Sequence, residues 1–276
     1  MTQVKKLSLP RKIYPEFYNK MKDMPVKYYI TLFVSLLMTL FAPAQQVVVP
    51  ELPTQKLLPV AHIHHILQDS EGYMWYATEG GGLCRDNGYQ IDVFRSDLNT
   101  PNLLSSNDIT CLTEDKNHHI WFGTKRGLYK LDKMNYSITE ITNEELRKQT
   151  IHAIRAIHDG TVWVSAEGII YHYSNDGKLL GSYPSQWKGH RQNVSDFYED
   201  SKHTLWVMQW GGGLLEYNPS TDSFLPHPWT CGASPTQMTE DRQNNCYWIA
   251  TWGKGIVQFV PSSDTQACLL YTSDAA

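Results

Sequence analysis

Hydrophobic and polar positions recur in one order five times along the chain. Each copy begins with two apolar residues three positions apart, continues with an acidic residue and a turn, and then reaches a tryptophan followed by a glycine and an aliphatic residue. The five tryptophans, separated by 42 to 46 residues, are Trp75, Trp121, Trp163, Trp206 and Trp248. A fixed period of this length is typical of β-propeller blades.

The other members of the repeat keep their order around each tryptophan. The apolar pairs are Ile63/Ile66, Ile109/Leu112, Ile151/Ile154, Val194/Phe197 and, in degenerate form, Pro235/Met238. The acidic residues are Asp69, Asp115, Asp200 and Asp241, with Asp159 displaced in a shortened third copy. The closing pairs are Gly82-Leu83, Gly127-Leu128, Gly168-Ile169, Gly213-Leu214 and Gly255-Ile256. We interpret this order as tandem duplication of one structural unit.

The residue order within a copy predicts a short run of antiparallel strands. The side chain of Asp69 can accept backbone N–H groups across a tight turn that Gly72 closes, which predicts a hairpin. The tryptophan opens the next strand and supplies a flat apolar side chain that packs between neighbouring sheets. A third strand follows the glycine, and a variable stretch holds the fourth. Four antiparallel strands per copy define a propeller blade.

We therefore expect an all-β fold: a β-propeller of about five four-stranded blades in a partial, incomplete ring. The expected blades are residues 61–106, 107–149, 150–192, 193–233 and 234–266. Residues 45–60 are expected to form a linker or a closing strand. An open array exposes the face and backbone of its fifth blade, so we also expect reduced stability and self-association.

The N-terminal segment predicts export. Basic residues precede an apolar run from Tyr28 to Phe41, which is followed by Ala42-Pro43-Ala44. This is the layout of a signal peptide, so residues 1–44 are expected to be a leader that is cleaved after Ala44. The apolar run is shorter than the roughly 20 residues of a membrane span, which makes a retained signal anchor the less favoured alternative.

Composition and charge narrow the class of protein. The chain has 276 residues, 41% of them hydrophobic and 19% charged, with a formal net charge of -4. Residues 1–44 hold seven basic and two acidic residues, which leaves 17 basic and 26 acidic residues in 45–276. A nucleic-acid partner is not expected, because no basic excess is available to neutralise phosphates. Eighteen glycines, 14 prolines and 12% aromatic residues suit short strands joined by tight turns.

The repeat resembles a known family. The pattern is clearest from Ile63 to Leu83, as Ile-x-x-Ile-x-x-Asp-x-x-Gly-x-x-Trp-x-x-Thr-x-x-Gly-Gly-Leu. It is similar to the two-component regulator propeller repeat of hybrid sensor kinases in Bacteroides-type bacteria, and the resemblance covers residues 61 to 262. It implies a periplasmic sensor, often of glycans, that precedes a membrane helix and a histidine kinase in a parent protein anchored in the inner membrane. A homodimer of that parent is compatible with the resemblance.

The resemblance also indicates how much of a complete sensor this chain contains. Sensors of this family have paired propellers of about seven blades, whereas five repeats do not close a standard ring unaided. None of the modules that follow the sensor in the family occurs in this sequence. We therefore expect the chain to correspond to the front of such a sensor, with residues 267–276 as a non-native tail and any membrane contact made through the downstream region.

Candidate ligand-binding residues fall in the loops between the second and third strands of each copy. In a propeller these loops share one face around the central channel. Trp210 and Trp252 lie at the same offset, four residues beyond the repeat tryptophan, and a flat indole beside polar groups suits a sugar ring. Their alternative role is packing under neighbouring loops. The candidates are Trp210, Trp252, Glu79, Lys125, Arg126, Glu167 and Lys254.

The remaining chemistry-bearing residues favour structural roles. His62 and His64 would share one strand face with no acidic or cysteine partner at ligand spacing, and His65 adds none, so neither a metal site nor a cofactor is expected. The repeated aspartates recur once per blade in a turn and are interpreted as structural. The cysteines are expected to be buried single thiols: Cys84, Cys111, Cys231, Cys246 and Cys268. No catalytic constellation is identified.

These observations leave three functional classes. The first is a non-enzymatic periplasmic sensor domain of a hybrid two-component system that binds a small molecule or an oligosaccharide. The second is a secreted propeller enzyme, a lyase or hydrolase acting on polysaccharide. The third is a propeller that binds another protein and no small ligand.

Overall fold

Twenty-two β-strands form the fold in the part of the chain that the structure describes. In this computed structural model, residue 25 and residues 58–144, 146, 148–261 and 265–269 are described, and the strands belong to one compact unit, Leu52–Ala276. The expected signal peptide, its cleavage site after Ala44 and most of the expected linker lie outside the described residues. Within the described part of the chain there are no α-helices, and so no helix with the length and apolar character of a membrane span.

Five four-stranded sheets follow one another along the chain. The first contains β1 (Ile63–Gln68), β2 (Met74–Thr78), β3 (Gly82–Asp86) and β4 (Ile91–Phe94). The second contains β5 (Ile109–Glu114), β6 (His119–Thr124), β7 (Gly127–Asp132) and β8 (Ile138–Glu140). The third contains β9 (Ile151–Ala156), β10 (Val162–Ala166), β11 (Ile169–Tyr173) and β12 (Leu179–Pro184).

The last two sheets are built in the same way. The fourth contains β15 (Val194–Glu199), β16 (Leu205–Gln209), β17 (Gly213–Asn218) and β18 (Ser223–His227). The fifth contains β19 (Ser234–Asp241), β20 (Cys246–Trp252), β21 (Gly255–Val260) and β22 (Thr265–Leu269). A small hairpin, β13 (Gln186–Trp187) with β14 (His190–Arg191), lies between the third and fourth sheets in sequence. Every pair of neighbouring strands is antiparallel.

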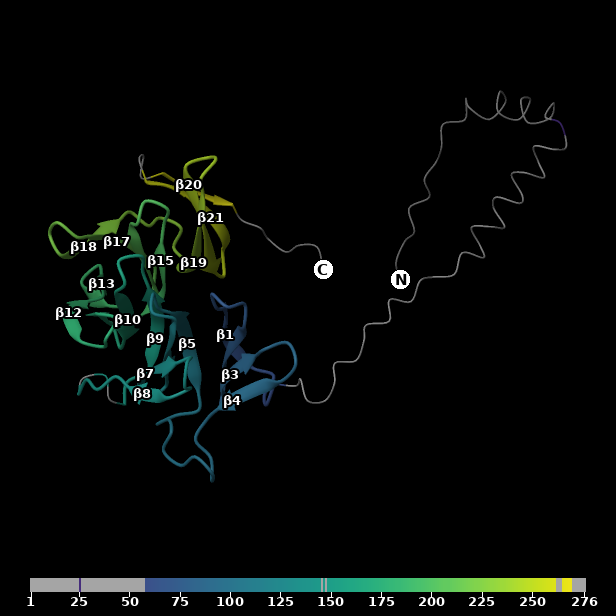
Figure 1. The fold of residues 1–276 in the computed structure, drawn as a ribbon. Coiled ribbons are helices and arrows are strands. Elements are labelled where there is room, and N and C mark those ends of the chain that lie inside the picture. The colour runs from purple at the N-terminus through teal and green to yellow at the C-terminus, as the bar shows by residue number, and fades with distance from the viewer. Residues whose placement is uncertain (1–24, 26–57, 145, 147, 262–264, 270–276) are drawn as a thin grey trace, which may run out of the picture. The chain divides into compact units, whose positions relative to one another are not determined.

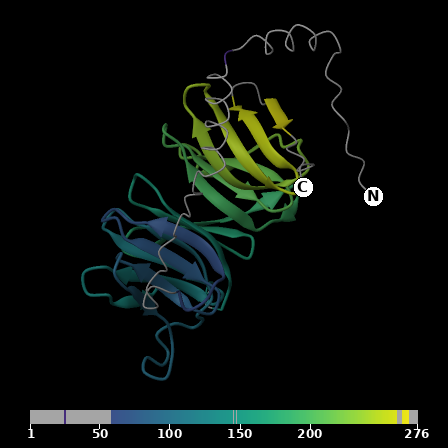
Figure 2. The same cartoon turned by 90° about the vertical axis from the view of Figure 1, so that its right-hand side faces the viewer.

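The five sheets form a β-propeller, which confirms the fold expected from the repeat. The first strands of successive sheets, β1, β5, β9, β15 and β19, are neighbours and line a central channel, whereas the fourth strands lie outside (Figures 1 and 2). Each sheet is therefore one blade. β22 pairs with β21 as far as Leu269, three residues into the expected tail, and the rest of that tail lies outside the described residues.

The repeat tryptophans stabilise the interfaces between blades. Each of the first four shares a buried cluster with the residue that comes just after the tryptophan of the following sheet. The four pairs are Trp75 and Phe122, Trp121 and Val164, Trp163 and Val207, and Trp206 and Ile249. The large planar side chain fills the space between two sheets, as its position in the sequence predicts.

The repeated aspartate holds both the turn and the tryptophan. Asp69 Oδ1 accepts the backbone N–H groups of Glu71 and Tyr73 at 3.0 and 2.9 Å, and Oδ2 accepts the indole N–H of Trp75 at 2.9 Å. Asp115 and Asp200 accept the equivalent bonds. The turn was predicted, but the bond to the indole was not.

The third blade departs from this pattern. Ile157 occupies the place of the aspartate, and the buried indole N–H of Trp163 has no hydrogen-bond partner among the residues described. The ring instead stacks on His172, with centroids 4.0 Å apart. The displaced Asp159 accepts the backbone N–H of Thr161 at 2.8 Å in an exposed turn. The turn is thus retained while the bond to the indole is lost.

The two end faces of the array are uncovered. Ile256 of the fifth blade is 45% exposed, whereas the equivalent Leu83, Leu128 and Leu214 are fully buried. On the other side, Ile66 of the first blade is 52% exposed, and its equivalents are all buried: Leu112, Ile154, Phe197 and Met238. These exposures agree with the expected incomplete ring.

Three of the described cysteines, Cys84, Cys111 and Cys246, are free thiols. Cys84, Cys111 and Cys246 are buried and Cys231 is half-buried. Burial raises the pKa of Cys84 to about 11 and that of Cys111 to about 12, so both stay protonated at neutral pH.

Candidate functional site

A β-bulge recurs at the start of the innermost strand of every blade. The pairing of the first and second strands skips one residue in each sheet. The skipped residues are His64, Thr110, His152, Ser195 and Thr236, and all five line one cavity of about 250 Å³. Since a bulge redirects a side chain from the sheet face, its repetition brings five polar residues together at one end of the channel.

Two of these residues also join neighbouring inner strands. Thr110 Oγ1 donates to the carbonyl of Ile151 at 2.6 Å, and Ser195 Oγ donates to the carbonyl of Pro235 at 2.5 Å. Each bond crosses from one blade to the next. The hydroxyls therefore hold neighbouring inner strands together, while their oxygens can still accept hydrogen bonds from a ligand.

Two uncharged imidazoles line this cavity. Burial lowers the pKa of His65, as does the nearby charge of Arg155, and burial lowers the pKa of His152. His65 Nδ1 and His152 Nε2 are buried without a hydrogen-bond partner in the described structure. The Nε2 atom of His152 lies 3.7 Å from Glu167 Oε1. Buried polar atoms that lack partners can bind a polar ligand at a lower desolvation cost.

Asp196 and Arg155 add opposite charges to the channel. Burial raises the pKa of Asp196, and the charge of Arg155 partly offsets this effect. Asp196 lines the cavity of the bulge residues and also a second cavity of about 410 Å³, which Arg155, Trp248 and Ile256 help to line. A polar tract therefore runs from the loop end of the channel to the uncovered side of the fifth blade.

The two predicted aromatic residues meet at the loop end of the channel. The rings of Trp210 and Trp252 have centroids 6.1 Å apart at an angle of 66°. Trp210 is 39% exposed and also lines the channel cavity, while Trp252 is 73% exposed. The indoles therefore present apolar surface beside a polar cavity.

The predicted charged residues fall into separate groups. Lys125 Nζ lies 3.7 Å from Glu79 Oε1 and 3.6 Å from Asp108 Oδ2, which joins the loops of the first two blades. Glu79 also pairs with His62 Nδ1 at 2.7 Å. Lys254 Nζ donates to the carbonyl of Cys231 at 3.0 Å.

The last two predicted residues, Arg126 and Glu167, are both exposed. Arg126 is exposed in its loop, and Glu167 is exposed next to His152, with a φ of 44°. Of the predicted set, the described contacts thus place Trp210, Trp252 and Glu167 nearest the channel cavity.

Sequence reasoning missed the bulge residues and the pair of Asp196 and Arg155. A signal for the bulge residues exists, because the position after the first apolar residue of each pair is polar in all five copies. Nothing in the sequence signals that Arg155 and Asp196 line one cavity, since they come from different blades and the propeller geometry alone brings them there.

Comparison with known proteins agrees with the fold and the repeat. The class that these blades define is the β-propeller. Residues 57–80 and 103–126 match the family model described as the two component regulator propeller. The chain thus carries the two component regulator propeller repeat, as its sequence pattern indicates. Among curated proteins, none matches the chain.

Solved structures with the same fold include extracellular domains and an enzyme. Two extracellular domains from B. thetaiotaomicron proteins described as hybrid two component systems are 22% and 19% identical, with TM-scores of 0.61 and 0.63 over 77% and 79% of this chain. The chain spans 28% and 30% of those two domains. Virginiamycin B lyase from Staphylococcus aureus is 18% identical, with a TM-score of 0.63 over 78% of this chain and 72% of its own.

Proposed function

We propose that this propeller is the extracytoplasmic sensing domain of a hybrid two-component system and binds a small polar ligand at the loop end of its channel. The observation that carries this proposal is the exposed pair of Trp210 and Trp252 beside a ring of polar bulge residues. The repeat family and the extracellular sensor domains of similar fold support the assignment to signalling. The kinase and the inner-membrane anchor belong to the parent protein.

The ligand class that suits this geometry is a glycan-derived oligosaccharide. Sugar rings stack one C–H face on an indole and offer hydroxyl groups to polar partners. His152 Nε2 and His65 Nδ1 are available as such partners within the cavity. A cavity of about 250 Å³ holds at most one or two sugar units, so the remainder of an oligosaccharide would lie on the loops.

Calorimetric titration with a panel of oligosaccharides tests the proposal. We expect one oligosaccharide class to bind, and the double substitution Trp210→Ala with Trp252→Ala to weaken it by about tenfold or more. Tyr89→Ala is the matched control, because Tyr89 is 86% exposed on the turn between β3 and β4 and lies outside the cavity lining. Equal affinity of the double variant and the unsubstituted chain would rule out Trp210 and Trp252 as the binding site.

The second candidate function is catalysis on polysaccharide. Its specific support is His152, whose uncharged Nε2 lies 3.7 Å from Glu167 and lines the cavity, an arrangement suited to proton abstraction. A lyase also shares the fold. Incubation with polysaccharides and detection of new reducing ends or unsaturated products separates the two functions, because the sensor binds its ligand unchanged.

A further inference from the structure

Glutamates that precede the repeat aspartates connect neighbouring blades. Glu114 of the second blade accepts the backbone N–H and the hydroxyl of Ser70 in the first blade, both at 2.7 Å. Glu240 of the fifth blade accepts the same two groups from Ser201 of the fourth blade, at 3.0 and 2.7 Å. We call this arrangement the glutamate clamp. It lies at the turn between the first and second strands, the end of the blade opposite the loops with Trp210 and Trp252.

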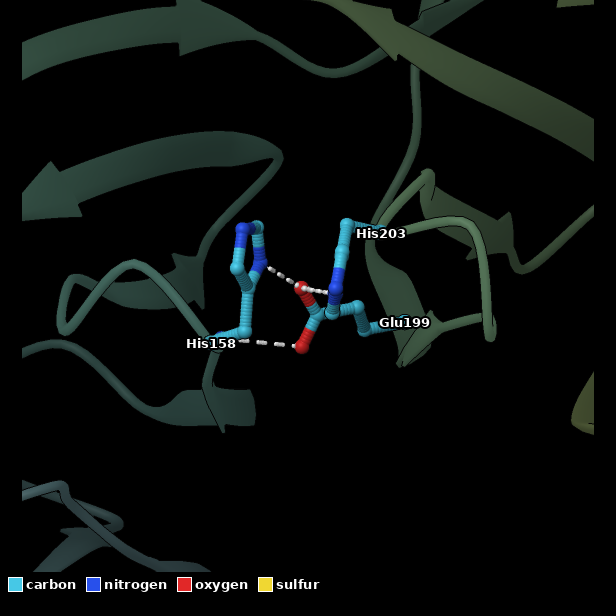
Figure 3. Close-up of side chains that lie close together, drawn as sticks. All are labelled: His158, Glu199 and His203. Atoms are coloured by element: carbon cyan, nitrogen blue, oxygen red, sulfur yellow. Dashed lines mark hydrogen bonds and ion pairs between the residues drawn. The ribbon is translucent and has the colours of Figure 1, made fainter.

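The clamp between the third and fourth blades contains two histidines. Glu199 accepts the backbone N–H of His158 at 3.0 Å and also contacts His158 Nδ1, because His158 replaces the serine of the other clamps. His203 Nδ1 lies 3.5 Å from Glu199 Oε1. The two imidazole rings stack with centroids 3.6 Å apart, and Figure 3 shows both beside the carboxylate.

The charge balance of this clamp differs from that of the others. Glu114 pairs with the nearly buried Lys133 at 2.7 Å, and Glu240 pairs with Arg242 at 3.3 Å. At Glu199 the ion pairs found among described residues involve only the two histidines. Pro219 stands where the second blade has Lys133, since each follows the last residue of its third strand.

An open space adjoins this clamp. A cavity of about 370 Å³ is lined by His158, His203, Leu205, Tyr217 and Pro219, among others. His158 and His203 are exposed, and the side chain of Glu199 is 16% exposed. The place that corresponds to the Lys133 ammonium group of the second blade is thus accessible from solvent in this clamp.

We propose that His158, Glu199 and His203 form a binding site for a divalent transition metal ion, Zn²⁺ in particular, which joins the third and fourth blades. Two imidazoles and one carboxylate are a common donor set for Zn²⁺, with water in the remaining positions. The three ligand atoms lie within 4.8 Å of one another. Bond lengths of about 2.0–2.2 Å place tetrahedral ligands roughly 3.3 Å apart, so the exposed imidazoles must unstack and turn inward.

The second blade supplies a natural counterpart that lacks the site. His118 stands three residues after Asp115, as His203 stands three residues after Asp200, and both histidines have a φ near 65°. His118 Nδ1 lies 3.3 Å from Glu114 Oε1. That clamp has a serine in place of the second imidazole, and the ammonium of Lys133 holds the cation position. We therefore expect metal binding at Glu199 and none at Glu114.

Titration of the untagged, chelator-treated chain with Zn²⁺, followed by calorimetry, tests the site. We expect one equivalent of Zn²⁺ to bind with a rise in melting temperature, since binding to the folded state alone stabilises it. His158→Ser retains the donors of an ordinary clamp and removes one ligand, so it should fold while its affinity for Zn²⁺ falls by at least about tenfold. His203→Ala should act similarly.

The control is His118→Ala, which should leave the affinity for Zn²⁺ unchanged. Co²⁺ provides a second readout, because a site of low coordination number gives strong visible absorption that His158→Ser should abolish. Binding should also weaken as the solution is acidified, because protons compete with the metal ion for the same ligand atoms. The proposal is overturned if Zn²⁺ does not bind, or if His158→Ser and His203→Ala bind it as tightly as the parent chain.

Discussion

Asp200 accepts four hydrogen bonds with one carboxylate. The backbone N–H groups of Lys202 and Thr204 donate to Oδ1 at 2.8 and 2.9 Å, and Trp206 Nε1 donates to Oδ2 at 3.0 Å. The fourth donor is the hydroxyl of Tyr247 in the following blade, at 2.6 Å. One side chain therefore closes a turn, orients the repeat tryptophan and contacts the next blade.

We expect Asp200→Asn to lower the free energy of unfolding by about 2–3 kcal/mol. The NH₂ group of asparagine cannot accept the hydrogen bonds that one of the two carboxylate oxygens accepts in the parent chain. Urea denaturation measures the change. The control is Asp159→Asn, which alters an exposed turn aspartate of the third blade and should cost under about 1 kcal/mol. Similar losses in the two variants would contradict the role assigned to the carboxylate.

The same carboxylates predict sensitivity to acid. Burial alone would raise the pKa of Asp69, Glu114 and Asp200, but the hydrogen bonds that they accept, with Lys133 at the first two, hold each pKa below its usual value. A pKa that is lower in the folded state adds stability above the unfolded value, and this stability is lost as pH falls. We expect the free energy of unfolding to drop below about pH 4.5, and less steeply in Asp200→Asn. A free energy of unfolding that does not change with pH would contradict this prediction.

How much of the residue-level structure the sequence predicts depends on the range of the interaction. The turn at Asp69 follows from residues within four positions, so the pattern predicts it. The bond from the indole of Trp75 back to the carboxylate depends on a side-chain direction that spacing does not reveal. The site of His158 and Glu199 was missed because its ligands lie 41 positions apart on different blades.

At the scale of elements, one position of the second strand shows how tightly blades pack. Gly123 lies two residues after Trp121, and a Cβ atom there would come within 2.5 Å of Ile151 Cβ in the next blade. Ala250 is the equivalent residue of the fifth blade, where it lines the cavity of about 410 Å³.

We expect Gly123→Ala to lower the free energy of unfolding by about 1–3 kcal/mol, because the blades must separate to admit the methyl group. Ala250→Val adds volume at the equivalent position of the uncovered face and should change stability by under about 0.5 kcal/mol. Denaturant titration of both variants measures the difference. Equal destabilisation would mean that the fifth-blade face is covered in solution.

The strands were predictable from the repeat, whereas the bulges were not. A bulge is defined by the register between two strands, and the sequence gives no direct measure of that register. The recurrence of polar residues at the bulge positions is visible only after the strands have been aligned. For the same reason the ligand-binding hypothesis started from the loops and included Lys125 and Glu79, whose described contacts join the first two blades away from the channel cavity.

Across all five blades, the uncovered end faces predict association between copies. Ile66 and Ile256 expose apolar surface on sheets whose equivalents elsewhere are buried. We expect sedimentation of the chain to show concentration-dependent association, and Ile256→Lys to reduce it, because a charge on that face opposes burial. Leu225→Lys is the control, since Leu225 is similarly exposed but lies on the outer strand β18. A monomer at all concentrations would contradict this prediction.

The hydrogen bonds between blades also bear on how the chain unfolds. Lys133 of the second blade donates to Asp69 of the first, and Tyr247 of the fifth donates to Asp200 of the fourth. If one blade detached, its predecessor would keep a buried acceptor with a missing donor, which is costly. Neighbouring repeats should therefore open together rather than one at a time, and the amide protons of their inner strands should exchange with solvent at similar rates.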